Sequence, residues 1–129
     1  MLYFLLITIT RGSVMQVADF VSEMDRMVCK GEIVDAVDRF FAEDATTLDF
    51  DGTATSTKGE MLEKMTGFVG AIEQVKGITH HHSVVGNNVS MSEFTFDFLM
   101  KDGGQILWHE IIRREWQQGK VVNEQYFKN

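Results

Sequence analysis

Apolar and polar side chains alternate along most of the last fifty residues of the chain. The alternation is clearest from Phe94 to Phe98 and again from Ile106 to Trp116, and a Gly-containing turn signal follows each stretch. A side-chain period of two between short turns is typical of consecutive antiparallel hairpins. The pattern therefore predicts a run of hairpins that ends with a strand from Val121 to Phe127.

The pairing of these strands decides which side chains face the core. A three-residue loop at Asp102–Gly104 pairs Phe98 with Trp108, whereas a two-residue loop pairs the phenylalanines with the other face of the next strand. We prefer the three-residue loop, because it gathers the aromatic residues on one face. Across the following turn, the same reasoning pairs Arg114 with Asn123. The predicted inward row is Phe94, Phe96, Phe98, Trp108, Glu110, Ile112, Arg114, Trp116, Val121, Asn123, Gln125 and Phe127.

Apolar residues recur at steps of three and four in three earlier segments, which is the period of a helix that buries one face. The first segment runs from Val17 to Val28 and the second from Ile33 to Phe41. The third opens at Thr57, which has capping-box spacing to Glu60. We expect this third helix to end at Gly77.

Two further segments alternate with a period of two and complete the predicted sheet. Ala45 to Asp51 lies between the second and third helices, and Ile78 to Val85 follows the third. Helices that cover one face of a largely antiparallel sheet make an α+β domain. We therefore predict an α+β fold, with three N-terminal helices packed on a curved, mixed or antiparallel sheet and a ligand pocket between them.

Composition and charge limit the classes of molecule that this domain is expected to bind. The chain has 129 residues and a formal net charge of −7. This charge argues against nucleic acid and anionic membranes as partners, because both select basic patches. Cys29 is the only cysteine. An intrachain disulfide is therefore excluded, and we expect a reducing, cytoplasmic environment.

The amino-terminal residues stand apart from this pattern. Leu2 to Thr10 is apolar but too short to span a bilayer, and it lacks the basic start and small-residue cleavage site of a signal peptide. We expect residues 1–14 to be either an extra edge strand or an extension that precedes a single domain at residues 15–129.

Two stretches resemble a known family. The run from Gly31 to Thr46, with Phe40-Phe41-Ala42-Glu43-Asp44 inside it, is similar to the second helix and first strand of SnoaL-like proteins. These belong to the nuclear transport factor 2-like (cystatin-like) superfamily. The ending from Gly119 to Phe127 resembles the close of the same domains. The resemblance implies a cone-shaped α+β fold but leaves the activity open, since the superfamily includes isomerases, cyclases, hydrolases and non-catalytic binding modules.

The ketosteroid isomerases of this superfamily allow a comparison residue by residue. Their general base is an Asp shortly after an Asp-Ala-Thr run, and Asp49 holds that position after Asp44-Ala45-Thr46. Their oxyanion site uses a first-helix Tyr and a protonated Asp, which spacing carries onto Met24 and Ile112. Neither of these can donate a hydrogen bond to an oxyanion. The resemblance thus implies a base without its electrophilic partner.

Asp49 and Glu110 are the candidate catalytic residues. Near Glu110 in an apolar pocket, Asp49 would have a raised pKa and accept a proton, whereas at a solvated strand end it would be ordinary surface polarity. Glu110 falls among aromatic residues, and a buried carboxylate needs a partner. It therefore either closes a structural hydrogen-bond network or contacts a ligand. The expected substrate-binding residues are His81, Phe96, Trp108, Arg114, Gln125 and Phe127.

Three consecutive histidines, His80 to His82, raise the question of a metal site. Side chains alternate faces along a strand, so His80 and His82 share one face and His81 lies on the other. Zinc and iron sites need at least a third ligand, and no cysteine is close in sequence. We therefore expect no metal and no other cofactor.

Two classes of function follow from this pattern. The first is a cofactor-free isomerase or cyclase that moves a proton on a small apolar molecule. Asp49 is its expected base, while Glu110, His81 and Arg114 polarise or orient the substrate. The second is a non-catalytic ligand-binding or dimerisation module. A homodimer is expected because the outer sheet face carries more apolar surface than a monomer normally exposes. The predicted residues of that face are Leu107, Ile111, Val122 and Tyr126.

Overall fold

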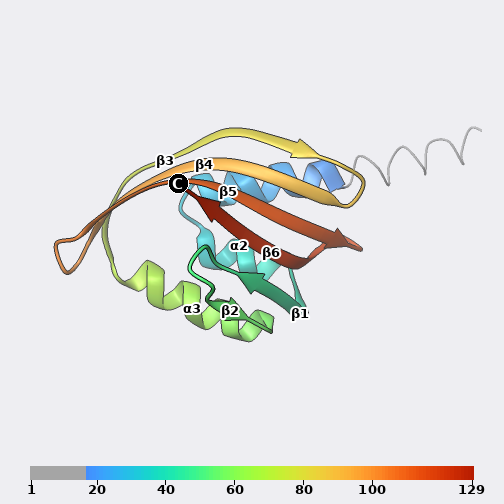
Figure 1. Cartoon of the computed structure of the whole chain (residues 1–129), viewed down its shortest axis with the longest axis horizontal. Coiled ribbons are helices and arrows are strands. Elements are labelled where there is room, and N and C mark those ends of the chain that lie inside the picture. Colours follow the sequence, from blue (N-terminus) through green and yellow to red (C-terminus); the bar gives the residue numbers. More distant parts are fainter. Residues whose placement is uncertain (1–16) are drawn as a thin grey trace, which may run out of the picture.

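The computed structural model describes residues 17–129, which form three helices on one face of a curved six-stranded sheet (Figure 1). This is the predicted α+β architecture. The expected strand or extension at residues 1–14 lies outside the described residues. The first helix covers residues 17–29. The elements that follow are α2 (Ile33–Phe40), β1 (Phe41–Leu48), β2 (Ala54–Thr55), α3 (Lys58–Gly70), β3 (Ile72–Val85), β4 (Val89–Met100), β5 (Gln105–Gln117) and β6 (Lys120–Lys128).

The sheet is mixed, with the strand order β2-β1-β6-β5-β4-β3. The strands from β3 to β6 pair antiparallel in sequence, whereas β1 pairs parallel with β6. The long strands β3, β4 and β5 arch over the helices (Figure 1). The two-residue strand β2 lies in a polar segment where the alternation of side chains predicts no strand. Within residues 17–129, none of the helices has the length and apolar character needed to cross a membrane.

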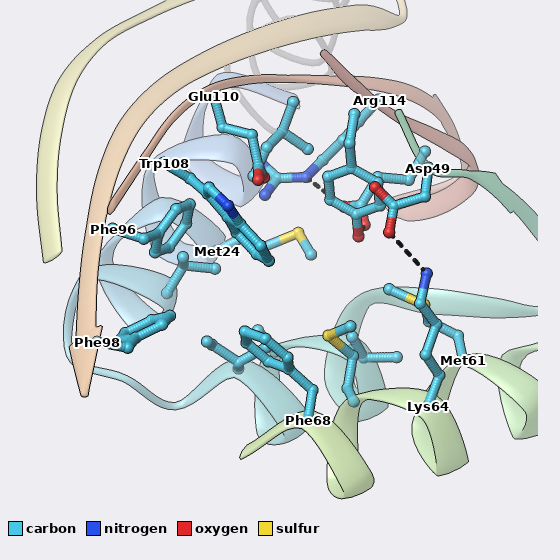
Figure 2. A pocket seen from close by; sticks show the side chains of 18 residues that line it. Met24, Asp49, Met61, Lys64, Phe68, Phe96, Phe98, Trp108, Glu110 and Arg114 are labelled. Atoms are coloured by element: carbon cyan, nitrogen blue, oxygen red, sulfur yellow. Dashed lines mark hydrogen bonds and ion pairs between the residues drawn. The ribbon is translucent and has the colours of Figure 1, made fainter. Parts of the chain in front are cut away.

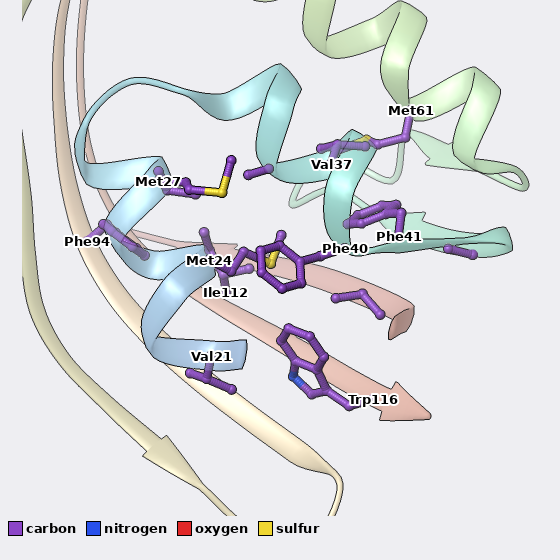
Figure 3. Close-up of a cluster of buried hydrophobic side chains, with 14 of the residues drawn as sticks. Val21, Met24, Met27, Val37, Phe40, Phe41, Met61, Phe94, Ile112 and Trp116 are labelled. Carbon is purple, nitrogen blue, oxygen red and sulfur yellow. The ribbon is translucent and has the colours of Figure 1, made fainter. Parts of the chain in front are cut away.

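The hydrophobic core lies between the concave face of the sheet and the helices (Figure 3). The first helix contributes Val21 and Met24, α2 contributes Val37 and Phe40, and β5 contributes Trp116, all of them buried. The helical steps of three and four residues place these side chains on one face of each helix. Burying each large apolar side chain stabilises the fold by about 1.5–3 kcal/mol.

Helix α3 begins where the capping box predicted and ends earlier than expected. The Thr57 hydroxyl accepts a hydrogen bond from the backbone N–H of Glu60 at 3.1 Å, and the Glu60 carboxylate accepts one from the N–H of Ser56 at 3.0 Å. The helix ends at Gly70 rather than at Gly77. Gly77 instead lies inside β3, at an irregularity in the pairing with β4, where an extra residue lets the strand bend.

The facing of β4 and β5 agrees with the prediction, although their register differs from it by two residues. Phe96 pairs with Trp108, and Phe98 pairs with Ile106 rather than with Trp108. The last residues to pair are Leu99 and Gln105, and the turn between the two strands, residues 101–104, is longer than the predicted three-residue loop. A shift of two keeps every side chain on its predicted face, so the phenylalanines, Trp108 and Glu110 still face the helices.

Strand β6, by contrast, is turned over relative to the prediction. Trp116 pairs with Val121 as expected, but Glu115 then pairs with Asn123, which leaves Val122 as a bulge. One extra residue reverses the facing of every residue that follows it. The inward residues of β6 are therefore Val121, Glu124, Tyr126 and Lys128. The inward facing predicted for Asn123, Gln125 and Phe127 was wrong.

Candidate functional site

A pocket lies between the concave face of the sheet and the helices α2 and α3 (Figure 2). Its cavity volume is about 130 Å³, similar to apolar cavities that hold a single aromatic ring. Most of its lining is apolar and comes from methionines, aliphatic residues and aromatic rings. The polar lining residues are Asp49, Lys64, Glu110, Arg114, Glu124 and Tyr126.

Aromatic side chains form the wall of the pocket on β4 and β5. Phe96 and Trp108, both predicted to bind substrate, line the cavity. The indole of Trp108 stacks on Phe68 from α3, with ring centroids 5.9 Å apart and planes inclined by 14°. The Lys128 ammonium also lies over the Trp108 ring, 3.9 Å from the ring centroid. The same ammonium is 3.7 Å from the centroid of the Phe50 ring. These contacts hold the indole in one orientation.

Glu110 is a buried carboxyl group that faces this cavity. Its side chain is only 7% exposed and points from β5 toward α3 (Figure 2). Among residues 17–129, no hydrogen bond or ion pair to its carboxylate is found. Burial raises the pKa of Glu110 to about 7, and the negative charges of Asp49 and Glu124 act in the same direction. Lys128 and Lys64 oppose this shift without cancelling it.

Asp49 lies just after β1 and lines the same pocket as Glu110. One carboxylate oxygen bonds the Lys64 ammonium at 3.1 Å, and the other accepts the backbone N–H of Phe50 at 2.8 Å. The expected closeness of the two acids is therefore present, but Asp49 is already held in an ion pair. Of the two carboxyl groups, only Glu110 is left without a partner among the described residues.

Arg114 joins three elements of the fold beneath the pocket. Its guanidinium is 1% exposed and donates to Asp25 of the first helix at 2.9 Å and to Glu124 of β6 at 2.8 Å. Asp25 also accepts hydrogen bonds from the hydroxyls of Ser83 at 2.6 Å and Ser92 at 2.9 Å. The predicted partner of Arg114 was Asn123, and both acids were missed. Asp25 could have been noticed, because it adjoins Met24 on the apolar face of its helix.

Glu124 links this buried network to the pocket wall. Its second carboxylate oxygen accepts a hydrogen bond from the Tyr126 hydroxyl. Burial raises the pKa of Glu124, although the Arg114 guanidinium opposes the shift. Tyr126 was expected on the outer face, and the bulge in β6 places it in the pocket lining instead.

Three predicted substrate-binding residues lie outside the pocket lining. His81 hydrogen-bonds the Thr95 hydroxyl at 2.7 Å, and its ring lies 5.8 Å from that of His109 on the outer face of the sheet. Gln125 and Phe127 face outward because of the bulge in β6. The positions expected for these three side chains were therefore wrong.

The histidine run also differs from regular alternation. The pairing of β3 with β4 is irregular between His80 and His82. His80 consequently points toward the interior, 2.7 Å from the Ser83 hydroxyl and 3.6 Å from Asp25, while His82 pairs with Glu93 on the outer face. The prediction that His80 and His82 share one face was wrong. In the described part of the chain, no three His, Cys, Asp or Glu side chains are arranged to hold a metal ion.

A family model for the SnoaL-like domain matches residues 13–128. The chain therefore belongs to the SnoaL-like family, as the two resembling stretches predicted. A search of curated proteins found no match.

Solved structures share this fold at low sequence identity. A candidate SnoaL-like polyketide cyclase from Mesorhizobium loti is 17% identical, with a TM-score of 0.77 over 86% of this chain and 97% of that chain. A nuclear transport factor 2-like protein from Burkholderia xenovorans is 15% identical, with a TM-score of 0.70 over 88% and 83%. A protein with a ketosteroid isomerase-like fold from Catenulispora acidiphila, in complex with trimethylamine, is 14% identical, with a TM-score of 0.64 over 73% of each chain. These likenesses show the cone-shaped fold.

Proposed function

We propose that the pocket is a proton-transfer site for a small apolar molecule, of the kind found in an isomerase or a cyclase. The observation that carries this proposal is Glu110, a buried carboxyl group without a partner among the described residues that faces a largely aromatic cavity. The likeness of the fold to a candidate polyketide cyclase supports the same class of chemistry.

In this proposal, Glu110 takes up and releases the proton. A carboxyl group whose pKa is about 7 is both a usable base and a usable acid near neutral pH. The apolar walls hold the substrate and keep bulk water away from the carboxylate. Asp49 then has a supporting role, since its ion pair with Lys64 leaves it less free to accept a proton, while its charge helps to keep a proton on Glu110.

The proposal can be tested with a probe that needs only a base. The bicyclic compound 5-nitrobenzisoxazole opens to a coloured phenolate when a carboxylate removes its carbon-bound proton. We expect the protein to accelerate this reaction with a pH midpoint near 7. The variant Glu110→Gln should lose at least about 100-fold in rate, because general-base catalysis is typically worth that much.

A matched control lies on the outer face of the same strand. Glu115→Gln removes a carboxylate that bonds Arg113 at 2.8 Å and should leave the rate unchanged. An unchanged rate in Glu110→Gln would contradict the assignment. If Asp49→Asn abolished the reaction instead, Asp49 would be the base, as the sequence suggested. Binding of the probe without any reaction would favour the alternative, a non-catalytic ligand-binding module.

The outer face of the sheet supports a second part of the proposal, a homodimer. Leu107 is 66% exposed and Phe127 is 47% exposed there, and Met91 of β4 is exposed on the same face. Phe127 thus takes the outward place that had been expected for Tyr126. Large exposed apolar patches are typical of protein interfaces. Sedimentation at tens of micromolar protein, roughly the range in which such interfaces hold, should show a dimer, and a monomer alone would contradict it.

A further inference from the structure

The comparison with ketosteroid isomerases left the site without an electrophile, because Met24 and Ile112 hold the positions of its donors. The structure supplies a donor from another strand. We propose that Tyr126 donates a hydrogen bond to a ligand oxygen in the pocket, and that Glu124 is the positioning residue that supplies its proton. The ligand is then a small carbonyl compound. This inference rests on the proposed function, in which Glu110 removes the proton.

The position of Tyr126 fits this role. The bulge at Val122 turns Tyr126 inward, where it pairs with Ile112 and lines the same cavity as Glu110. Glu110 pairs with Lys128, so Glu110 and Tyr126 are diagonal neighbours on adjacent strands, with a separation of about 7–8 Å. A small molecule between them can meet the carboxyl group at one carbon and the phenol at its oxygen.

The charges around Arg114 explain how Tyr126 becomes a donor. Asp25, Arg114 and Glu124 are all at most 2% exposed, and these two carboxylates share one guanidinium. The other groups that face them are the His80 ring, 3.6 Å from Asp25, and Lys64, whose charge lowers the pKa of Glu124. Within the three fully buried groups, one negative charge is in excess. Uncompensated buried charge is strongly unfavourable, so the cluster favours binding one extra proton. Asp25 accepts from Arg114 and two serine hydroxyls, which stabilise its anion. Glu124, whose pKa burial raises, is thus the better place for that proton. With Glu124 neutral, burial and the charge of Asp49 still raise the pKa of Glu110.

The protonation state of Glu124 sets the direction of its bond to Tyr126. When Glu124 is ionised, the phenol donates to it and offers the cavity only lone pairs. When Glu124 is protonated, its O–H donates to the phenol oxygen, and the phenol hydrogen is free to turn into the cavity. Glu124 therefore decides whether Tyr126 can stabilise negative charge on a ligand.

The resulting step balances. The C–H bond next to a carbonyl breaks, its proton goes to the Glu110 carboxylate, and its electron pair moves to the carbonyl oxygen. If that oxygen only accepts a hydrogen bond from Tyr126, Tyr126 and Glu124 keep their protons. If it takes the proton of Tyr126, the Tyr126 oxygen takes the proton of Glu124. Return of a proton from Glu110 to another carbon reverses these transfers and leaves an isomerised ligand, with every residue in its starting state.

Binding of the phenolate form of 4-nitrophenol tests the donor without any reaction. The measurement is made in Glu110→Gln, whose amide mimics protonated Glu110, at a pH at which the probe is ionised. Adding Tyr126→Phe should weaken binding about tenfold or more, as expected for loss of a hydrogen bond to a charged group. Binding of neutral nitrobenzene should change little. Equal weakening of both probes would mean that Tyr126 only packs, and would overturn the inference.

Glu124→Gln in the same Glu110→Gln background provides a second test. In the parent, phenolate binding should decline at high pH as Glu124 loses its proton. The Gln amide can donate to Tyr126 at every pH, so this decline should be absent in the Glu124→Gln variant. If phenolate binding showed the same pH dependence with and without Glu124→Gln, the role of Glu124 would be overturned. If the Glu110→Gln parent bound neither probe, the whole inference would be overturned. The protein could also fail to show any reaction that depends on Glu110 and still bind the phenolate through Tyr126. That result would refute only the proposed function.

Discussion

Arg114 and Glu110 are both buried on the inward face of β5, and their surroundings are opposite. Arg114 bonds Asp25 and Glu124 and ties three elements together. Glu110 faces a cavity and has no such bond among the described residues. A buried charged group that is bonded to its partners fixes how the elements pack. A buried ionisable group without partners is costly to desolvate, and a ligand that bonds it can offset this cost. The contrast locates the site better than burial or charge alone.

Removing the partnered charge should have the largest effect. Arg114→Met leaves Asp25 and Glu124 buried without a cation, and we expect the free energy of unfolding to fall by about 3–5 kcal/mol near neutral pH. Urea unfolding measures the loss. Arg113→Met, on the outer face, removes only a partly exposed pair with Glu115 and should cost less than about 1 kcal/mol. Similar losses in the two variants would show that the buried network is not structural.

Glu110 should behave in the opposite way. Its pKa rises from 4.5 to about 7 on folding, so the folded protein holds the proton more tightly than the unfolded chain. The free energy of unfolding therefore decreases as the pH rises from about 4.5 to 7, by up to about 3 kcal/mol from this group. Glu110→Gln should remove that decrease and be more stable than the parent above pH 7. Parallel stability curves for the two proteins would contradict the raised pKa.

The coupling between Asp49 and Glu110 should give a smaller effect. Asp49→Asn removes a negative charge that raises the pKa of Glu110 and releases Lys64, so both changes should lower that pKa toward its ordinary value. Titration of carbon-13-labelled glutamate carboxyls by NMR measures it directly. Asp97→Asn, on the outward-facing side of β4, is the control and should leave the Glu110 titration in place. An unmoved midpoint in Asp49→Asn would remove Asp49 from the site.

The outer face should give the smallest change in stability. Leu107→Glu replaces a side chain that is 66% exposed, and we expect the free energy of unfolding to change by no more than about 0.5 kcal/mol. The same variant should convert the proposed dimer to monomer in sedimentation. Val75 is an exposed valine of β3 that pairs with the inward-facing Phe98, so it does not belong to the outer face. The control variant Val75→Glu should therefore keep the dimer. Dissociation by both variants alike would argue against this face as the interface.

Much of the fold followed from periodicity alone. The helical steps and the alternation in β4 and β5 predicted the order of elements and the facing of Phe96, Trp108 and Glu110. β6 could not be predicted in this way, because both of its faces carry apolar residues. Val121 with Phe127 and Val122 with Tyr126 make equally plausible inward pairs. The choice depends on a bulge, whose cost depends on packing against the neighbouring strand and helices.

The partners of Arg114 show a second limit of sequence reasoning. Asp25 stands out in sequence as a charge beside the apolar face of the first helix. Its pairing with Arg114 joins residues separated by 89 positions, and nothing local to either residue indicates the other. The predicted facing of the three histidines was wrong for a related reason, because the irregular pairing of β3 with β4 interrupts the alternation of faces.

The bulge at Val122 also bears on how such a pocket can change over evolution. In a regular β6, the same stretch of sequence would present two amides, Asn123 and Gln125, and a phenyl ring to the ligand. With the bulge, it presents a carboxyl group, a phenol and an ammonium. A single insertion or deletion near the preceding turn can therefore exchange a whole row of pocket chemistry at once. Relatives with this fold can diverge in activity by such length changes, without substituting any of the residues involved.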